Sequence, residues 1–319
     1  MGATTRSSRA RTLLLSTGFA AALLGSSLMP STAPAVAAAQ PAATVACTSS
    51  AQPKLAADLA SDIRAARRER ASSVALWVSD PVDDLTCWLS GSAHFDSASV
   101  VKVLILGALL RKAEDKHRYL TSTEMTEAHA MITRSDNNAA SALWAELGYS
   151  YLRHFLALAG MTQTSLGADD YWGLTQITAH DETLLLRLLL TANSVLDGSS
   201  RAYALHLMAT VIASQRWGTP AGAPESVTVH VKNGWLPRAT HGWRIHSLGA
   251  FTWPKGWYTI VVLTQDNPTM AYGVTTIERI ARAVNHDLNP TAKSVIPSST
   301  VSSSWGTPDE RIPALPGIP

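Results

Sequence analysis

The sequence predicts an α/β domain in which both ends of the chain build one five-stranded antiparallel sheet and an all-helical region is inserted between them. Two strand-like segments precede a long helical stretch, and three more strand-like segments follow it. Strands that flank a helical middle favour a single sheet over two separate domains. A chain of 319 residues can bury one or two substantial cores, and we expect one.

The N-terminal part of the predicted domain combines one helix with two strands. Apolar residues recur at helical spacing over residues 55–68, which predicts the helix. Strands are predicted over 73–79 and 84–89, because a short segment with a proline and two aspartates separates two runs of strand-forming residues.

The middle of the chain is predicted to be helical. Its most apolar helix is Ser99–Arg111. The other predicted helices span 123–133, 138–147, 151–158, 178–191 and 201–213. A polar and aromatic loop over 166–177 holds Asp169, Asp170 and Trp172.

Strand patterns return in the C-terminal part of the chain. Strands are predicted over 227–232, 243–252 and 257–263, and a last helix over 271–287. The domain is therefore expected to span 54–289. Residues 290–319 are rich in Ser, Thr and Pro, and we expect them to form an exposed tail.

Residues 1–39 have the parts of a secretory signal peptide. They hold three arginines and no acidic residue, followed by an apolar stretch and an Ala-x-Ala exit. A membrane anchor is the alternative, but glycines and serines interrupt the apolar stretch. We expect a Sec-type signal, because no two of these three N-terminal arginines are adjacent. The mature protein would then be secreted, with a flexible leader over 40–53 and no membrane span.

The composition excludes several classes of protein. With 46% apolar residues and ten Trp, the chain can form a core and is not disordered throughout. The net charge is +2, and removal of the three N-terminal arginines leaves about −1. Such a balance provides no broad cationic surface for nucleic acid. The ten histidines show no zinc-like spacing, so we expect neither metal nor cofactor, and we expect a monomer.

The chain has two cysteines, Cys47 in the predicted leader and Cys87 in a predicted strand. An exported protein meets an oxidising compartment, which favours a disulfide between them. Two buried free thiols are the main alternative. A lipid on Cys47 is less favoured, because this cysteine lies well beyond the apolar stretch of the signal.

The first candidate catalytic pair is Ser99 and Lys102. Residues i and i+3 share a helix face, so the hydroxyl and the amine can meet. Lys102 is the only charged residue between Asp96 and Arg111. An amine surrounded by apolar residues gives up its proton more readily and can act as a base on the neighbouring serine. A serine that begins a helix beside a lysine that extends to the surface would give the same spacing.

Two further polar motifs follow at the ends of predicted elements. Ser135-Asp136-Asn137 lies between two helices, where a helix cap is the ordinary interpretation. Lys232-Asn233-Gly234 ends a strand, where a lysine and a glycine can simply mark a turn.

Together and in this order, the three motifs resemble the Ser-x-x-Lys, Ser-Asp-Asn and Lys-Thr-Gly set of the class A β-lactamases and penicillin-binding serine peptidases. The resemblance covers about residues 55–287 and includes the order of strands and helices. It implies a β-lactamase or DD-peptidase-like fold with an acyl-transfer site.

The resemblance assigns four catalytic residues. Ser99 would be the nucleophile, and Lys102 would accept or relay its proton. Ser135 would pass a proton to the leaving nitrogen, and Lys232 would hold that hydroxyl and attract an anionic substrate.

The resemblance also assigns substrate-binding residues. Asn137 would meet the substrate amide, and Asn233 its carboxylate. Gly234 would let the substrate approach the strand edge, and the backbone N–H groups of Trp235 and Ser99 would form the oxyanion hole. Arg244 is either a partner of the substrate carboxylate or a surface arginine.

Two positions depart from the family pattern. Asn233 stands where the family has Thr or Ser. The class A enzymes also use a Glu, in a loop after the second motif, to activate the deacylating water. Here no Glu occurs between Glu146 and Glu182, and the loop over 166–177 offers only Asp169 and Asp170.

These features leave three functional hypotheses. The first is an exported class A-type β-lactamase that opens a β-lactam amide through a Ser99 acyl-enzyme. The second is a penicillin-interactive peptidase or esterase, acting on cell-wall or other acyl substrates with slow or no lactam turnover. The third is a non-catalytic penicillin- or wall-binding protein. The four intact catalytic-type residues disfavour the third.

Overall fold

The computed structural model describes residues 44–298. The predicted signal peptide, the first residues of the predicted leader and the end of the predicted tail lie outside the described residues. Between residues 44 and 298, no helix is both long enough and apolar enough to span a bilayer.

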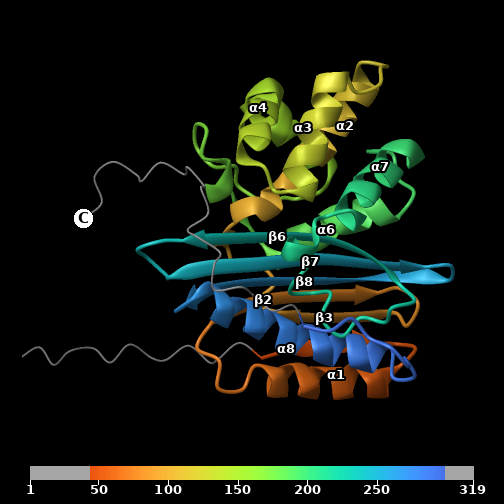
Figure 1. The fold of residues 1–319 in the computed structure, drawn as a ribbon. Coiled ribbons are helices and arrows are strands. Elements are labelled where there is room, and N and C mark those ends of the chain that lie inside the picture. Colours follow the sequence, from red (N-terminus) through yellow and green to blue (C-terminus); the bar gives the residue numbers. More distant parts are fainter. Residues whose placement is uncertain (1–43, 299–319) are drawn as a thin grey trace, which may run out of the picture. The chain divides into compact units, whose positions relative to one another are not determined.

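Six antiparallel strands form the main sheet, in the order β1-β3-β2-β8-β7-β6 (Figure 1). The strands are β1 (Ala46–Ser49), β2 (Ser73–Asp80), β3 (Leu85–Leu89), β6 (Thr228–Pro237), β7 (Trp243–Trp253) and β8 (Gly256–Asn267). β2 pairs with β8, where Ser73 lies opposite Gln265. This pair joins the two ends of the chain, so the prediction that both ends build one sheet is confirmed.

The predicted number of five strands is wrong, because β1 adds a sixth. It lies inside the segment expected to be a flexible leader and pairs with β3, with Cys47 opposite Cys87. Only four residues, Ala-Cys-Thr-Ser, form this strand, too few to show an alternating pattern. A disulfide joins Cys47 to Cys87, as predicted.

Helices cover both faces of the sheet. The first and last helices, α1 (Pro53–Ala66) and α8 (Met270–Leu288), lie side by side on one face (Figure 1). The inserted helical region lies over the other face. Its helices are α2 (Lys102–Asp115), α3 (Ser122–Thr133), α4 (Asn137–Leu147), α5 (Tyr149–Leu158), α6 (Ala179–Leu190) and α7 (Gly198–Ala209).

Several short elements connect these layers. β4 (Phe95–Asp96) pairs with β5 (Gln176–Ile177) in a two-stranded sheet, and the 3-10 helix η1 (Ala98–Val101) leads into α2. The other two 3-10 helices of the described chain are η2 (Trp172–Leu174) and η3 (Ala213–Gln215). Ser99 therefore lies in a 3-10 turn rather than in the α-helix predicted to begin there.

Several predicted segments end differently in the structure. The strand predicted over 227–232 continues to Pro237, so Lys232-Asn233-Gly234 lies inside β6 instead of ending it, and the strand predicted over 257–263 continues to Asn267. The helix predicted over 201–213 ends at Ala209, because η3 follows it instead of a further turn of α-helix. The tail predicted from residue 290 begins with attached residues: Ile296 N donates to Ala223 O at 2.8 Å, and Gly222 N donates to Ile296 O at 2.9 Å.

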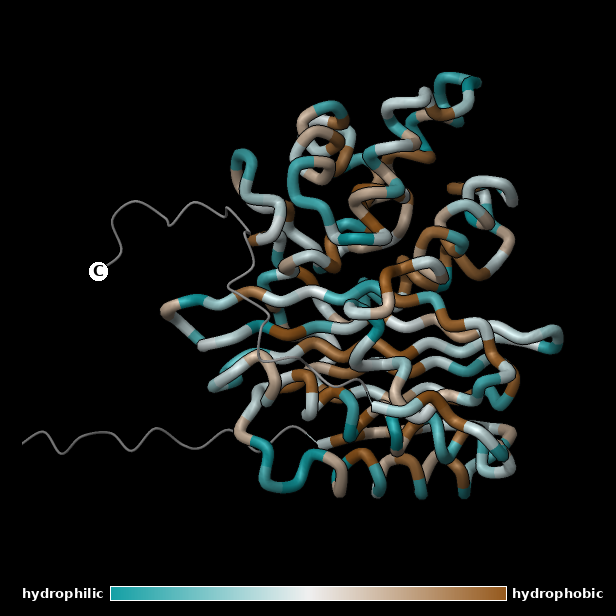
Figure 2. Tube along the Cα trace, in the orientation of Figure 1, coloured by the Kyte–Doolittle hydropathy of each residue, from teal (hydrophilic) through white to brown (hydrophobic). Residues whose placement is uncertain are grey.

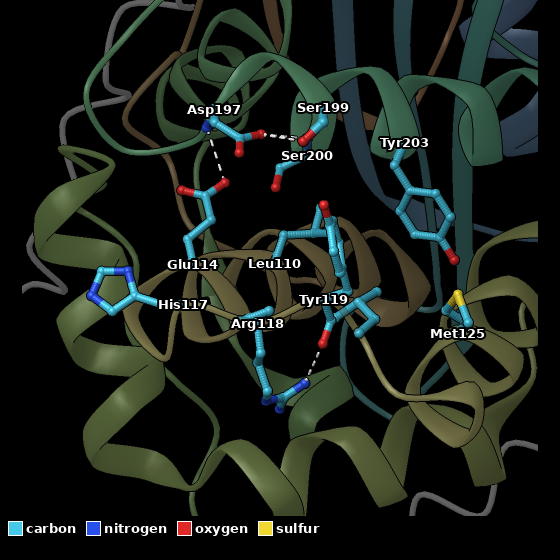
Figure 3. Close-up of a pocket in the computed structure, with 12 residues that line it drawn as sticks. Leu110, Glu114, His117, Arg118, Tyr119, Met125, Asp197, Ser199, Ser200 and Tyr203 are labelled. Atoms are coloured by element: carbon cyan, nitrogen blue, oxygen red, sulfur yellow. Dashed lines mark hydrogen bonds between the residues drawn. The ribbon is translucent and has the colours of Figure 1, made fainter.

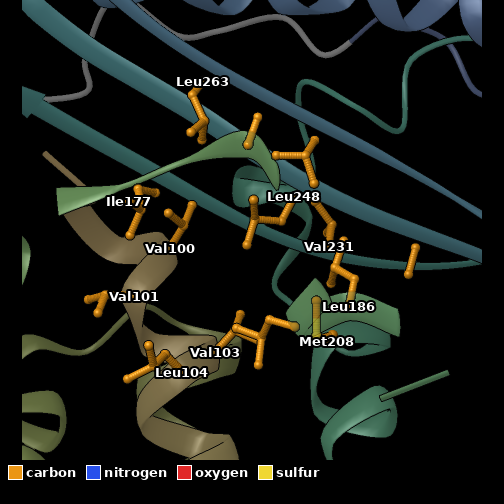
Figure 4. Packing of buried hydrophobic residues seen from close by; sticks show 14 of the residues in the cluster. Val100, Val101, Val103, Leu104, Ile177, Leu186, Met208, Val231, Leu248 and Leu263 are labelled. Atoms are coloured by element: carbon orange, nitrogen blue, oxygen red, sulfur yellow. The ribbon is translucent and has the colours of Figure 1, made fainter. Parts of the chain in front are cut away.

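The core between the sheet and the helical region surrounds the start of α2 (Figure 4). Val100, Val101, Val103 and Leu104 are fully buried, and Leu248 of β7 belongs to the same cluster. The hydropathy colouring shows apolar segments of the helices and strands gathered where the two layers meet (Figure 2). This packing fixes the position of Lys102 within an apolar surrounding.

Candidate active site

Ser99 and Lys102 lie one turn apart where η1 runs into α2. Lys102 Nζ lies 2.9 Å from Ser99 Oγ, and neither residue has exposed surface. Ala98, directly before Ser99, has a φ of 47°, a left-handed conformation that is strained for a residue with a Cβ. The sharp turn presents the serine hydroxyl to the lysine, as the spacing of three residues predicts.

The Ser135-Asp136-Asn137 motif forms the turn between α3 and α4. Asp136 caps α4, because its side chain accepts a hydrogen bond from Ala139 N at 2.9 Å. Ser135 has a φ of 58°, and this left-handed turn places its groups beside Lys102. Lys102 Nζ donates to Ser135 O at 2.7 Å and to Asn137 Oδ1 at 2.7 Å. One residue of the motif thus serves as the cap while its two neighbours contact the lysine.

Lys232 reaches the same place from the edge strand β6. Its Nζ donates to Ser135 Oγ at 2.9 Å and to Asn233 O at 2.8 Å, and the side chain is fully buried. Lys102 Nζ lies 3.1 Å from Ser135 Oγ. Two lysines therefore share one serine hydroxyl.

Gly234 lies two residues after Lys232 and touches the turn that carries the nucleophile candidate. A Cβ at Gly234 would lie 2.9 Å from Ser99 N and 3.0 Å from Val100 N, which are both backbone atoms. Only a glycine lets β6 approach η1 this closely. The three motifs, which are far apart in sequence, thus form one contiguous site between the sheet and the helical region.

Comparison with protein families identifies the chain. A sequence profile of the beta-lactamase enzyme family matches residues 126–288, half of the chain. The protein belongs to the β-lactamase family. The matched region includes Ser135 and Lys232 but begins after Ser99 and Lys102. The structure, and not this match, brings Ser99 and Lys102 together with the other two motifs.

Solved structures of the β-lactamase family have the same fold. A class A β-lactamase from Bacteroides cellulosilyticus superimposes with a TM-score of 0.63 at 18% sequence identity, covering 73% of this chain and 98% of that one. For a β-lactamase from Sphaerobacter thermophilus the TM-score is 0.61, the identity 20% and the coverage 72% and 96%. An ancestral class A β-lactamase superimposes with a TM-score of 0.61 at 19% identity, and the match covers 71% of this chain and 98% of that one. No curated protein sequence matches the chain.

Asn233, which replaces the Thr or Ser of the β-lactamase family, makes contacts that the sequence did not predict. Its Nδ2 donates to Gln215 O and to Trp217 O, both at 2.8 Å. Both amide hydrogens are therefore used inside the protein. The neighbouring Trp235 is buried with its ring 6.0 Å from that of Trp217, so its side chain belongs to the core.

The loop in which class A enzymes of this family carry their glutamate places a tryptophan near the lysine. The centroid of a Trp172 ring lies 4.8 Å from Lys102 Nζ, and Trp172 Nε1 donates to Ser141 Oγ at 3.0 Å. Asp169 and Asp170, the two acidic residues of this loop, are both exposed. The sequence did not reveal this contact, because it depends on how the loop folds back onto α2.

Arg244 is not a surface arginine. It is 4% exposed and forms an ion pair with Asp96, with Nε 3.1 Å from Oδ2. The backbone oxygen of Asp96 accepts a hydrogen bond from Nε2 of the fully buried His246, whose Nδ1 accepts from Thr264 N. Burial lowers the pKa of His246 to about 4, so its neutral form holds the segment just before the Ser99 turn.

A separate cavity of about 620 Å³ opens at the other end of α2 (Figure 3). The exposed Tyr119, together with Met125 and Tyr203, contributes to its wall. Glu114 and Asp197 also line it, and Glu114 Oε1 accepts from Asp197 N at 3.0 Å. Leu110, which lines the cavity, is eight residues beyond Lys102, about 12 Å along the helix.

Within residues 44–298, no group of three or more His, Cys, Asp or Glu is arranged to hold a metal ion.

Proposed function

We propose that this protein is a serine hydrolase that opens the amide of a β-lactam by forming an acyl-enzyme on Ser99. The observation that carries the proposal is the position of Lys102 Nζ, 2.9 Å from Ser99 Oγ, with both residues buried. A base must lie within hydrogen-bond distance of the proton that it removes, and this amine does.

Hydrogen-bond geometry supports Lys102 as the base. Ser135 O and Asn137 Oδ1 can only accept, and each lies 2.7 Å from Nζ. A neutral amine has two hydrogens and one lone pair. If both hydrogens bind these two oxygens, the lone pair is left for the hydroxyl of Ser99. The Ser99 oxygen can then attack the lactam carbonyl while its proton passes to Lys102.

Ser135 is the proposed donor to the lactam nitrogen as the C–N bond breaks. Its hydroxyl lies between Lys102 and Lys232, at 3.1 and 2.9 Å from their Nζ atoms. A proton that Lys102 has taken from Ser99 can therefore pass through Ser135 Oγ to the departing nitrogen. Lys232 orients that hydroxyl and attracts the carboxylate that penicillins and cephalosporins carry.

The oxyanion hole is proposed to consist of the backbone N–H groups of Ser99 and Trp235. The close approach of Gly234 to Ser99 N supports this assignment, because it brings β6 against the turn that holds Ser99. Asn137 is the proposed contact for the substrate amide. Both amide hydrogens of Asn233 bind backbone oxygens of the protein, so Oδ1 is the side-chain atom of Asn233 that is not used in these two hydrogen bonds.

A specific observation favours a second candidate function, a penicillin-interactive peptidase or esterase with slow lactam turnover. Both aspartates of the 166–177 loop are exposed, and the side chain of that loop that faces Lys102 is Trp172. An acyl-enzyme without a carboxylate to activate water would persist. Both candidates share the acylation step and differ only in how the ester is released.

The test combines a chromogenic cephalosporin, a labelled penicillin and the variants Ser99→Ala and Ser199→Ala. We expect the wild type and S199A, whose serine is exposed on α7, to take up label, and S99A to take up none. Continuous colour release supports the lactamase, whereas a stable label without turnover supports the second candidate. Absence of Ser99-dependent label from folded wild type would contradict both.

We also propose that the protein is exported through a signal peptide over residues 1–39 and acts as a monomer on a small acyl substrate. The Cys47–Cys87 disulfide supports export, because disulfides form in oxidising compartments. Mass analysis of the N-terminus of protein recovered from the medium tests it, and we expect a mature chain that begins near residue 40. Retention of Met1 would contradict cleavage.

A further inference from the structure

Trp172 is held rigidly against the site by contacts on both its side chain and its backbone. Its indole N–H donates to Ser141 Oγ at 3.0 Å, and its backbone oxygen accepts from Ser97 Oγ at 3.3 Å. Only 6% of its surface is exposed. Ser97 lies two residues before Ser99, so the tryptophan is anchored to the segment that presents the nucleophile candidate.

The ring faces the ammonium group of Lys102. The ring centroid is 4.8 Å from Nζ, within the distance of about 6 Å at which an aromatic face attracts a cation. The attraction acts only on the charged form of the lysine and is strongest in a desolvated site. Lys102 is such a case, because it has no exposed surface.

Other groups around Lys102 also affect the equilibrium between its charged and neutral forms. The ammonium of Lys232, which shares Ser135 Oγ, disfavours a second positive charge, and so does burial. The carboxylate of Asp136 is directed to Ala139 N, and the carboxylates of Asp169 and Asp170 are exposed.

Charged residues also occur on the elements packed against α2: Arg134, at the end of α3, directly precedes Ser135 and is exposed, and Glu124 of α3 forms an ion pair with Arg118. On α2 itself the next are Arg111 and Lys112, more than two turns beyond Lys102. His129, His154 and His206, on α3, α5 and α7, are exposed. Ser135 O and Asn137 Oδ1, which accept hydrogen bonds from Nζ, favour the charged form of Lys102 against Lys232 and burial, and the aromatic face of Trp172 adds to them.

We propose that Trp172 is a positioning residue that stabilises the charged ammonium of Lys102 through its ring and thereby raises the pH above which Ser99 is acylated. The inference rests on the proposed acyl transfer by Ser99. Lys102 must be neutral to accept the proton of Ser99, so a group that favours the charged form moves the onset of acylation to higher pH.

The test is the pH dependence of acylation by labelled penicillin, followed as a rate between about pH 4.5 and 9.5. Trp172→Leu keeps an apolar cover over Lys102 and removes the aromatic face. We expect the acid-side midpoint of its rate profile to move to lower pH by about 0.5 to 1.5 units, the range that a cation–π interaction implies. Trp172→Phe keeps a weaker aromatic face, and its midpoint should lie between those of W172L and the wild type.

Trp144→Phe is the matched control. Trp144 Nε1 donates to Asp169 O at 3.3 Å and so anchors the same loop, and Trp144 is 3% exposed. We expect its midpoint to stay at the wild-type pH, while thermal melting verifies that each variant is folded. An equal shift in W144F would overturn the inference, because the cause would then be disturbance of the loop.

The remaining outcomes separate the inference from the proposed function. A labelled wild type with unchanged midpoints in W172L and W172F would overturn the role of Trp172 and leave acylation of Ser99 standing. If W172L does not fold, the inference is tested with W172F alone: an acid-side midpoint below that of the wild type supports the role of Trp172, and an unchanged midpoint overturns it. A wild type that shows no Ser99-dependent label overturns the proposed function, and the role of Trp172 with it.

Discussion

The hydroxyl of Ser135 lies between the side chains of Lys102 and Lys232. Its Oγ lies within hydrogen-bond distance of the amino groups of two buried lysines, and its backbone oxygen accepts from one of them, Lys102. The left-handed φ of 58° makes both contacts possible, because it turns the residue back between α3 and α4. A strained residue in such a place is characteristic of a functional site.

Ser135→Ala removes the hydroxyl while leaving the backbone contact to Lys102 in place. We expect the acylation rate to fall by about 10²-fold or more, because general acid–base catalysis contributes about 10²–10⁴-fold. The measurement is the rate of labelled-penicillin uptake, with S199A as the control. A rate within twofold of the wild type would contradict the proposed proton path.

Gly234→Ala tests the contact between β6 and η1. The added Cβ would collide with Ser99 N and Val100 N, and backbone atoms cannot rotate away. We expect acylation to fall by about 10²-fold, the cost of displacing a site by roughly 1 Å. Stability should fall by about 1–3 kcal/mol, as overpacking does.

Gly198→Ala is the matched control for that substitution. Its Cβ would meet only the side chain of Arg201, at 3.8 Å, near the start of α7. Acylation and melting temperature should therefore remain near the wild-type values. Equal losses in G198A and G234A would show that the close approach at Gly234 has no special importance.

At the scale of elements, α6 carries an unusual buried acid. Glu182 lies in its first turns with no exposed surface, and neither carboxyl oxygen has a hydrogen-bond partner in the described part of the chain. Burial, assisted by the neighbouring Asp181, raises the pKa of Glu182 to about 8. The folded protein therefore holds this carboxyl in its neutral form near pH 7.

Glu182→Gln should change how stability depends on pH. In the unfolded chain a glutamate ionises near its ordinary pKa of 4.5, well below the folded value of about 8. The stability associated with the neutral carboxyl is complete below about pH 4.5, declines as the pH rises and is lost above about pH 8. The variant lacks this decline, so its advantage over the wild type should grow from pH 5 to pH 9, to an order of a few kcal/mol.

Urea unfolding at pH 5, 7 and 9 measures the effect. Glu225→Gln, at an exposed position, provides the comparison and should follow the wild type at every pH. Parallel curves for E182Q and the wild type would contradict a buried neutral carboxyl.

Elements with a strong pattern could be predicted from the sequence, and contacts between them could not. The spacing of Ser99 and Lys102 predicted their contact, since a helical turn alone brings them together. The contact of Trp172 with Lys102 and the ion pair of Asp96 with Arg244 depend on loops and strands folding against each other. Asn233 shows the same limit, because its amide binds a segment sixteen to eighteen residues earlier.

At the scale of the whole molecule, the disulfide and the candidate site belong to opposite edges of the sheet. β1, with Cys47, is one edge strand, and β6, with Lys232, is the other. The disulfide therefore strengthens the fold without touching the chemistry.

A variant with both Cys47→Ser and Cys87→Ser tests this separation. We expect its unfolding free energy to fall by about 2–4 kcal/mol, the usual contribution of a disulfide. Acylation well below the melting temperature should keep its wild-type rate. The checks are urea unfolding and labelled-penicillin uptake, and a slower acylation in the folded variant would contradict the separation of the two edges.

The pairing of Ser73 with Gln265 also sets the timing of folding. The centre of the sheet cannot close before β8 has left the ribosome, whereas the local contacts of the helical region can form earlier. Such a high contact order slows folding. The sheet of the nascent chain therefore cannot close until β8 is made, and a polypeptide whose sheet has not closed can still be threaded through a secretion channel.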